Sequence, residues 1–88
     1  MSDEMTLLPE QSRAARALLD WSRGDLASRS GVSVAALADF EAGKRQPYER
    51  TLADIRRALE SAGVIFVSEN GEGPGVRLRK DNGAKSKA

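Results

Sequence analysis

The sequence predicts a mainly α fold, in which four helices are followed by a C-terminal β-hairpin. Two residue pairs, Ser22 with Asp25 and Thr51 with Asp54, have the spacing of a capping box, which marks the first turn of a helix. Glycines follow the second, third and fourth expected helices and mark their ends. An apolar run at residues 64–67 then brings a β-branched and aromatic composition. With 88 residues, the chain has the length of one small domain.

The first two helices follow a short arm. Residues 1–8 are interpreted as a flexible N-terminal arm, and Pro9 then stands in the first turn of a helix, where proline is tolerated. This helix runs to about Asp20. Its apolar stripe is Ala15, Leu18 and Leu19. Ser22 begins the second helix and Gly31 ends it.

The third and fourth helices follow a tight turn that Val32 anchors. Ser33 is expected to cap a helix over residues 34–42, which Gly43 closes. The first turn of the fourth helix is expected to begin at Thr51. Apolar side chains at helical spacing predict a core consisting of Trp21, Leu26, Leu37, Phe40, Leu52, Ile55 and Leu59.

The C-terminal part, residues 63–80, is expected to form a β-hairpin with turn residues at 70–75. A single hairpin is marginally stable and its free edge needs cover, so we expect the same element of a second subunit to pair with it. The predicted homodimer interface consists of Val64, Ile65, Phe66, Val67, Val76 and Leu78. Residues 81–88 carry two lysines and no large apolar side chain, and are interpreted as a disordered basic tail.

The composition argues against an enzyme. The chain has no cysteine and no histidine, so we expect no thiolate nucleophile, no disulfide, no Cys/His metal site and no cofactor. No stretch approaches the roughly 20 apolar residues of a membrane span, and the N-terminus is acidic where a signal peptide is basic. We therefore expect a cytoplasmic protein with no membrane partner. The net charge is only +1, but cations gather in the second half of the chain and predict a locally basic surface.

Three segments together carry a resemblance to a known family. They are residues 21–27 (Trp-Ser-Arg-Gly-Asp-Leu-Ala), 31–33 (Gly-Val-Ser) and 37–47 (Leu-Ala-Asp-Phe-Glu-Ala-Gly-Lys-Arg-Gln-Pro). With this joint pattern the sequence, over about residues 9–62, resembles the Cro-repressor or XRE family of helix-turn-helix transcriptional regulators. The resemblance implies a lambda-repressor-like four-helix domain. Its second helix would lie across the DNA backbone and its third would enter the major groove.

The resemblance also implies which residues bind DNA. Carried over by position, they are Arg23, Ser33, Val34, Ala35, Asp39, Lys44, Arg45 and Gln46. The family usually has glutamine where Arg23 stands, and commonly has hydrogen-bonding side chains in place of Val34 and Ala35. These two either contact thymine methyl groups or only favour the helix, whereas Asp39 is able to accept a hydrogen bond from cytosine N4. We therefore expect specificity to depend also on groove shape and half-site spacing.

Two further positions have structural roles in the family. At the positions of Arg16 and Glu41, an ion pair ties the first helix to the end of the third, so we interpret Glu41 as a structural carboxylate. Lys44 and Arg45 are expected to contact phosphates, because a long cation at a helix end or in a loop reaches the DNA backbone.

The expected function is a sequence-specific transcriptional regulator, a repressor that binds a palindromic operator as a homodimer. Double-stranded DNA and a second copy of the chain are the expected partners, and DNA-bound molecules would be associated with the nucleoid. The alternative is an antitoxin-type module that binds a toxin protein and autoregulates its operon, although only a short tail is available to fold on such a partner. An enzyme ranks last, since no group of residues supplies a nucleophile with a base.

Overall fold

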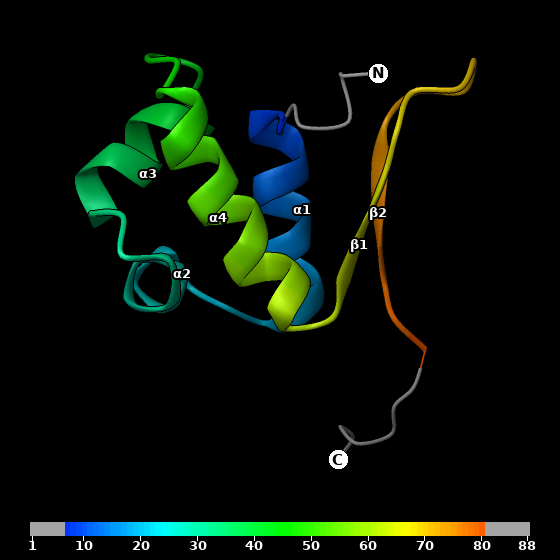
Figure 1. Cartoon of the computed structure of the whole chain (residues 1–88), viewed down its shortest axis with the longest axis horizontal. Helices are drawn as coiled ribbons and strands as arrows, with labels where there is room; N and C mark the ends of the chain where they lie inside the picture. The colour runs from blue at the N-terminus through cyan, green and yellow to red at the C-terminus, as the bar shows by residue number, and fades with distance from the viewer. Residues whose placement is uncertain (1–6, 81–88) are drawn as a thin grey trace.

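The computed structural model describes residues 7–80, in which four helices are followed by two strands (Figure 1). The elements are α1 (Pro9–Leu19), α2 (Arg23–Ser30), α3 (Val34–Glu41), α4 (Glu49–Ser61), β1 (Val64–Val67) and β2 (Gly75–Leu78). The predicted fold class, mainly α with a C-terminal hairpin, is confirmed. The expected tail at 81–88 and most of the expected arm lie outside the described residues. Within the described range, no helix has both the length and the apolar character needed to cross a bilayer.

Local hydrogen bonds explain where α2 and α3 begin. The Ser22 hydroxyl accepts from the Asp25 amide at 3.0 Å, and the Asp25 carboxylate accepts from the Ser22 amide at 2.9 Å, which is the predicted capping box. The Ser33 hydroxyl accepts from the Ala36 amide at 3.1 Å. Gly31 ends α2 with φ of 79°, in the left-handed region that glycine adopts most easily. The chain therefore turns sharply, and Figure 1 shows α2 end-on while α3 runs across the view.

The start of α4 differs from the prediction. The helix begins at Glu49, before Thr51, and Thr51 and Asp54 form no capping box. Asp54 instead accepts a hydrogen bond from Arg57 at 2.9 Å. The N-cap is Tyr48, whose backbone is extended with φ −63° and ψ 156°, and Pro47 precedes it outside the helix.

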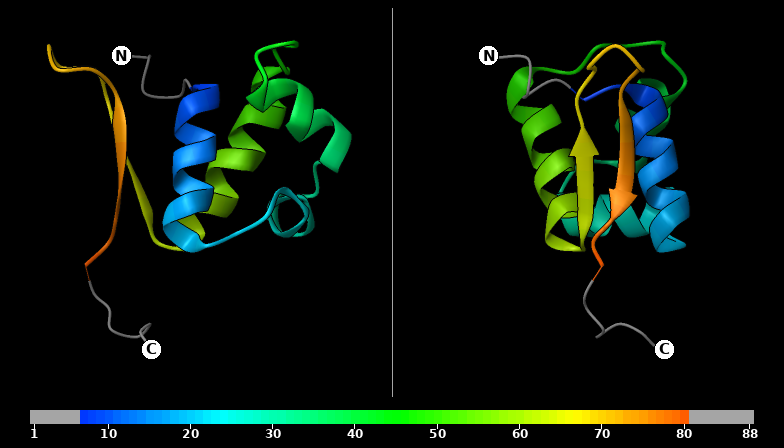
Figure 2. Two further views of the ribbon diagram at one scale, coloured as in Figure 1. Left: turned by 180° about the vertical axis from the view of Figure 1, so that it is seen from behind. Right: turned by 90° about the vertical axis from the view of Figure 1, so that its right-hand side faces the viewer.

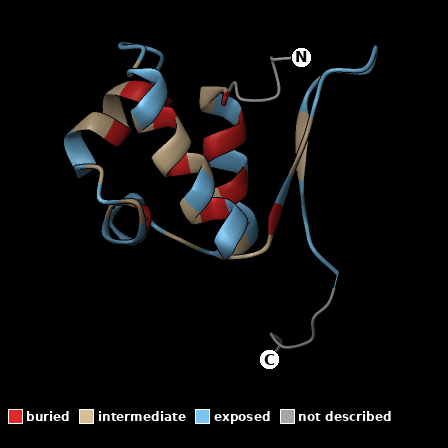
Figure 3. Ribbon diagram, viewed as in Figure 1, coloured by how far each residue is buried: buried red, intermediate tan, exposed pale blue. Residues whose placement is uncertain are grey.

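The hydrophobic core lies between the helices and the inner face of the hairpin (Figure 3). Its buried apolar residues are Leu7, Ala15, Leu26, Leu37, Phe40, Leu52, Ile55, Leu59 and Val64. The core positions predicted in α2, α3 and α4 are therefore confirmed. Trp21 is only partly buried at the edge of this core, and the Arg29 guanidinium lies 4.8 Å from its ring centroid.

Two expectations at the N-terminal end were wrong. Leu7, placed in the flexible arm, is 1% exposed and belongs to the core. Leu18, placed in the apolar stripe of α1, is 42% exposed. The buried face of α1 includes Gln11, Ser12 and Ala15, so Leu18 falls at its border, and Leu7 covers the core just before the helix begins.

β1 and β2 form an antiparallel hairpin that packs beside α1 and α4 (Figure 2). The register pairs Val64 with Leu78 and Phe66 with Val76, which places these four side chains on one face of the hairpin. Phe66 and Val76 pack against the core, and Val64 is 1% exposed within it. Val64 was predicted to lie in a homodimer interface, but its side chain is already enclosed by its own chain.

Two side chains from the helices hold the hairpin in place. Gln11 Nε2 donates to the Gly75 carbonyl at 3.1 Å, and Gln11 Oε1 accepts from the Leu8 amide at 3.1 Å. The Arg56 guanidinium lies 4.8 Å from the centroid of the Phe66 ring and is paired with Glu60 at 2.9 Å. The hairpin is thereby tied to both α1 and α4.

Candidate nucleic-acid interface

The first two residues of α3 and the Ser33 cap before them are open to solvent. Val34 is 49% exposed, Ser33 and Ala35 are exposed, and Asp39 is half-buried. The Ser33 hydroxyl already caps the helix, so its side chain is fixed by an internal hydrogen bond. Side chains of Val34 and Ala35 offer only apolar contacts, and neither is covered by the hairpin. The structure thus presents a small, smooth helical surface at this end of α3.

The C-terminal end of α3 is buried. Phe40 and Glu41 are each 1% exposed. A buried carboxylate is costly unless it is paired and hydrogen-bonded. Glu41 meets this need with three side-chain hydrogen bonds, from Ser12 Oγ at 2.6 Å, Arg16 Nε at 3.0 Å and Arg16 Nη2 at 2.7 Å.

Arg16 makes the Glu41 site rigid. Its two nitrogens engage the two carboxylate oxygens side by side, the geometry that makes arginine–carboxylate pairs strong and directional. A third nitrogen, Nη1, donates to the Trp21 carbonyl at 3.2 Å. The pair implied by the family resemblance is therefore present, and it joins α1 to the end of α3.

Arg13 adds a contact to the backbone of the same helix end. Its Nη1 donates to the carbonyl of Glu41, one of the terminal carbonyls that α3 itself leaves without a partner. A cation at this position also interacts favourably with the negative end of the helix dipole. α1 therefore holds the C-terminus of α3 through Ser12, Arg13 and Arg16 together.

Arg23 lies at the margin of this cluster. Its Nη1 is 3.9 Å from Glu41 Oε1, and its side chain is 45% exposed. The exposed fraction of the Arg16 side chain is only 17%. Arg23 is thus the first residue of α2 and lies between the buried carboxylate and solvent.

Beyond α3, the chain forms an exposed cationic loop, defined here as Lys44, Arg45 and Gln46. A hydrogen-bonded turn fixes where this loop leaves the helix. The Gly43 amide donates to the Phe40 carbonyl at 3.0 Å, and the Lys44 amide donates to the Asp39 carbonyl at 2.8 Å. Gly43 has φ of 77°, which confirms its predicted place at the helix end. The loop therefore begins beside the last turn of α3.

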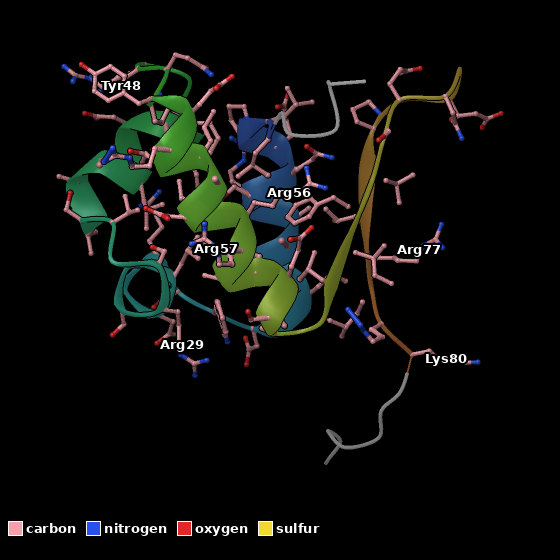
Figure 4. The ribbon with its side chains drawn as sticks, in the orientation of Figure 1. Arg29, Tyr48, Arg56, Arg57, Arg77 and Lys80 are labelled. Atoms are coloured by element: carbon pink, nitrogen blue, oxygen red, sulfur yellow. The ribbon has the colours of Figure 1, made fainter. Side chains whose placement is uncertain are left out.

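Some residues of this region were missed by the sequence analysis. Tyr48 is 86% exposed at the N-cap of α4, two residues after Gln46 of the cationic loop (Figure 4). Ser12 and Arg13 complete the Glu41 site, and Gln11 reaches the hairpin. Ser12 stands one turn before Arg16, so helical spacing places the two side chains on the same face of α1. Because both are polar, the pattern of apolar residues does not mark Ser12 as buried.

Arg77 and Lys80 lie away from this surface. Figure 4 shows both on the hairpin, at the side of the molecule opposite to α3. α2, the turn at residues 31–33 and α3 form a helix-turn-helix arrangement, in which the N-terminal end of α3 is exposed.

Comparison with known families agrees with this arrangement. The model of the helix-turn-helix family matches residues 13–62, which is more than half of the chain. The protein belongs to the XRE-type helix-turn-helix family, as the motif resemblance implied. The matched region includes α2, α3 and α4 and leaves out the hairpin.

Curated relatives give the same family. The chain is 40% identical over 47 residues to an uncharacterised HTH-type transcriptional regulator of Mycobacterium bovis. It has the same identity over the same length to proteins of this description from two strains of Mycobacterium tuberculosis. The matches cover 53% of this chain but only 18% of each relative. The similarity is therefore to one part of longer proteins.

Proposed function

We propose that the protein is a DNA-binding transcriptional regulator that inserts the N-terminal half of α3 into the major groove. One observation carries the proposal: α3 is exposed at its N-terminal end and locked at its C-terminal end, beside a cationic loop. A recognition helix needs both a free surface and a fixed pose, since a base contact depends on the orientation of the whole helix. The names of the relatives, HTH-type transcriptional regulators, support the same role.

Lys44 and Arg45 are proposed to contact phosphates on either side of the groove. Both side chains are exposed in the loop that directly follows α3. Neither takes part in an ion pair with another described residue. Arg23, at the start of α2, is proposed to make a further phosphate contact. These charges would supply sequence-independent affinity that falls as salt rises.

Base readout is proposed to be apolar and limited. Val34 and Ala35 fit thymine methyl groups, and the half-buried Asp39 is placed on the same helix to accept from a cytosine amino group. Ser33 and Gln46 complete the proposed contact set. Because such contacts discriminate weakly, specificity would also depend on the deformability of the site.

A homodimer would contact two half-sites and so double the number of base contacts. The outer face of the hairpin carries Ile65 and Val67, and Ile65 is 36% exposed. Leu78 lies on the other face, opposite Val64 at the end of the hairpin, and is 41% exposed. We propose that these residues, with the edges of Phe66 and Val76, pair with a second copy. Two copies of α3 would then lie roughly 34 Å apart, one turn of DNA, and bind a palindromic operator. Such a complex on a promoter would exclude polymerase and act as a repressor.

The phosphate contacts are tested with a duplex selected from a random pool by the purified protein. The variant carrying both Lys44→Ala and Arg45→Ala should bind more weakly, and the slope of log affinity against log salt should become shallower by about 2, since each lost phosphate contact removes about 0.9. Two controls should bind like the original chain: the charge-preserving Lys44→Arg with Arg45→Lys, and Arg57→Ala on the remote part of α4. An unchanged slope in the double alanine variant would remove the cationic loop from the interface.

The homodimer is tested separately by light scattering at micromolar concentration, with and without the selected duplex. The expected mass is that of two chains. Replacing the exposed Ile65 by Lys should convert it to one chain without unfolding the helices. A mass of one chain for the original protein under both conditions would contradict the dimer while leaving DNA binding by α3 open to its own test.

A further inference from the structure

Tyr48 is an exposed aromatic residue at a helix end. Its exposed fraction is 86%, the largest among the large hydrophobic side chains of residues 7–80 that are open to solvent. Its hydroxyl makes no hydrogen bond to another described residue, and its side chain does not cap α4. Internal packing and local hydrogen bonding therefore give no reason for a tyrosine at this position.

The N-cap residues of α3 and α4 have the same backbone conformation, but only the one of α3 caps its helix with its side chain. Ser33, the N-cap of α3, has φ −66° and ψ 153°, and its hydroxyl accepts from the amide three residues on at 3.1 Å. Tyr48, the N-cap of α4, has φ −63° and ψ 156°. The two backbones are nearly identical, so a serine at position 48 would be placed to cap the Thr51 amide. Tyrosine gives up a stabilising bond that this backbone is shaped to form.

The residues near Tyr48 in the sequence indicate which kind of surface its side chain is suited to contact. Only Pro47 separates it from the cationic loop, the exposed Glu49 follows it, and the exposed Arg50 stands two residues later. In Figure 4 the Tyr48 ring projects from the end of the molecule where this loop connects α3 to α4. An amphipathic ring with a terminal hydroxyl, close in sequence to Arg45 and Arg50, suits a surface that is both apolar and rich in acceptor oxygens. The sugar–phosphate backbone of DNA is such a surface.

We propose that Tyr48 is a DNA contact, with its ring against a deoxyribose and its hydroxyl donating a hydrogen bond to a phosphate oxygen. This inference rests on the DNA-binding function proposed above and adds a residue to it. Tyr48 therefore exchanges stability of the free protein for affinity in the complex. Substitution should move these two quantities in opposite directions, which no purely structural role for Tyr48 would produce.

The test compares three variants by thermal unfolding and by binding to the selected duplex. Tyr48→Ser should raise Tm by about 5 °C, because it restores a helix cap, and weaken binding about three- to tenfold. Tyr48→Ala should weaken binding as much without raising Tm. Tyr48→Phe keeps the ring and should lose only the part due to the hydroxyl, about threefold.

The outcomes separate this inference from the proposed function. If the original protein selects and binds a duplex but Tyr48→Ser binds it equally well, the Tyr48 contact is wrong and the α3 interface stands. If Tyr48→Ser lowers Tm, the tyrosine supports the fold and the proposed exchange is wrong. If the original protein binds no duplex, the function itself fails.

A chemical measurement on the unaltered protein gives an independent result. Tyr48 is the single tyrosine, and the chain contains no cysteine, so nitration by tetranitromethane has one phenolic target that peptide mass mapping can locate. The free protein should be nitrated readily at this exposed ring. Saturating DNA should slow the nitration of Tyr48 at least several-fold. An equal rate with and without saturating DNA would overturn the contact.

Discussion

The two ends of α3 are built in opposite ways. At the C-terminal end, Phe40 and Glu41 are each 1% exposed, and residues of α1 donate hydrogen bonds to the carboxylate and the backbone carbonyl of Glu41. At the N-terminal end, Val34 is 49% exposed and the Ser33 hydroxyl caps the helix. The difference teaches that the pose of the helix is set at one end so that the other is free to make contacts. Substitutions at the two ends should therefore affect different properties, stability at one and binding at the other.

The largest effect is expected for Arg16→Ala. This change leaves the Glu41 carboxylate buried with the Ser12 hydroxyl as its main partner, and should cost about 3 to 5 kcal/mol of unfolding free energy. Glu41→Ala should cost less, because the Arg16 side chain is 17% exposed and is able to turn toward water. Urea unfolding followed by circular dichroism measures both. Equal or reversed costs would contradict a site organised around the buried carboxylate, and Glu72→Ala in the hairpin turn serves as an exposed control.

A moderate effect is expected for Gln11→Ala. The substitution removes the hydrogen bonds that join α1 to Gly75 and to the Leu8 amide, and should cost about 1 to 2 kcal/mol. Because Gln11 does not touch Glu41 in the described contacts, the loss should add to that of Glu41→Ala within about 0.5 kcal/mol in the double variant. Strong coupling between the two substitutions would show that the hairpin also sets the orientation of α3, and would contradict the view that α1 fixes the C-terminal end of α3 by itself.

A smaller loss is expected at the free end of α3. Ser33→Ala removes the only side-chain cap of this helix and should cost about 1 kcal/mol, while Ser33→Asp should retain most of the stability. Amide hydrogen exchange should show the extra opening confined to the first turn of α3. Faster exchange that extends to Phe40 and Glu41 would mean that the helix moves as one unit, contrary to the division proposed here.

The smallest stability effect is expected for Val34→Ala. Its half-exposed side chain contributes little packing, so the unfolding free energy should change by less than about 0.5 kcal/mol. Affinity for a duplex with thymine at the contacted position should still fall severalfold, and discrimination against uracil, which lacks the methyl group, should shrink. A variant that loses stability but keeps this discrimination would assign Val34 to packing.

Local signals made most of the fold predictable. The Ser22–Asp25 box, the Ser33 cap and Gly31 and Gly43 act through hydrogen bonds or φ angles within a few residues, so the sequence contains them directly. The start of α4 was misplaced because Thr51 and Asp54 have the spacing of a capping box, although the helix begins earlier, at Glu49 after the N-cap Tyr48. Residue spacing alone does not show that a helix begins before its apparent capping box.

Contacts between distant segments were less predictable. The Arg16–Glu41 pair came from the family resemblance, whereas Ser12 and Arg13 in the same site were not found. Gln11 and Gly75 are 64 positions apart, and no local pattern joins them. Leu7 is buried because the segment just before α1 covers the core, and the hydrophobicity of the sequence does not show where the core ends. Tyr48 was not singled out, because no local pattern shows that its side chain remains exposed at the start of α4.

The most direct measurement is a two-dimensional amide NMR spectrum of the labelled protein titrated with the selected duplex. If α3 is held at one end and binds at the other, the largest shifts should occur at the amides of residues 33–35, 44–46 and 48. The amides around Ser12 and Arg16 should change little, because their site is already formed in the free protein. Shifts concentrated on β1 and β2, with residues 33–35 unaffected, would contradict the proposed interface.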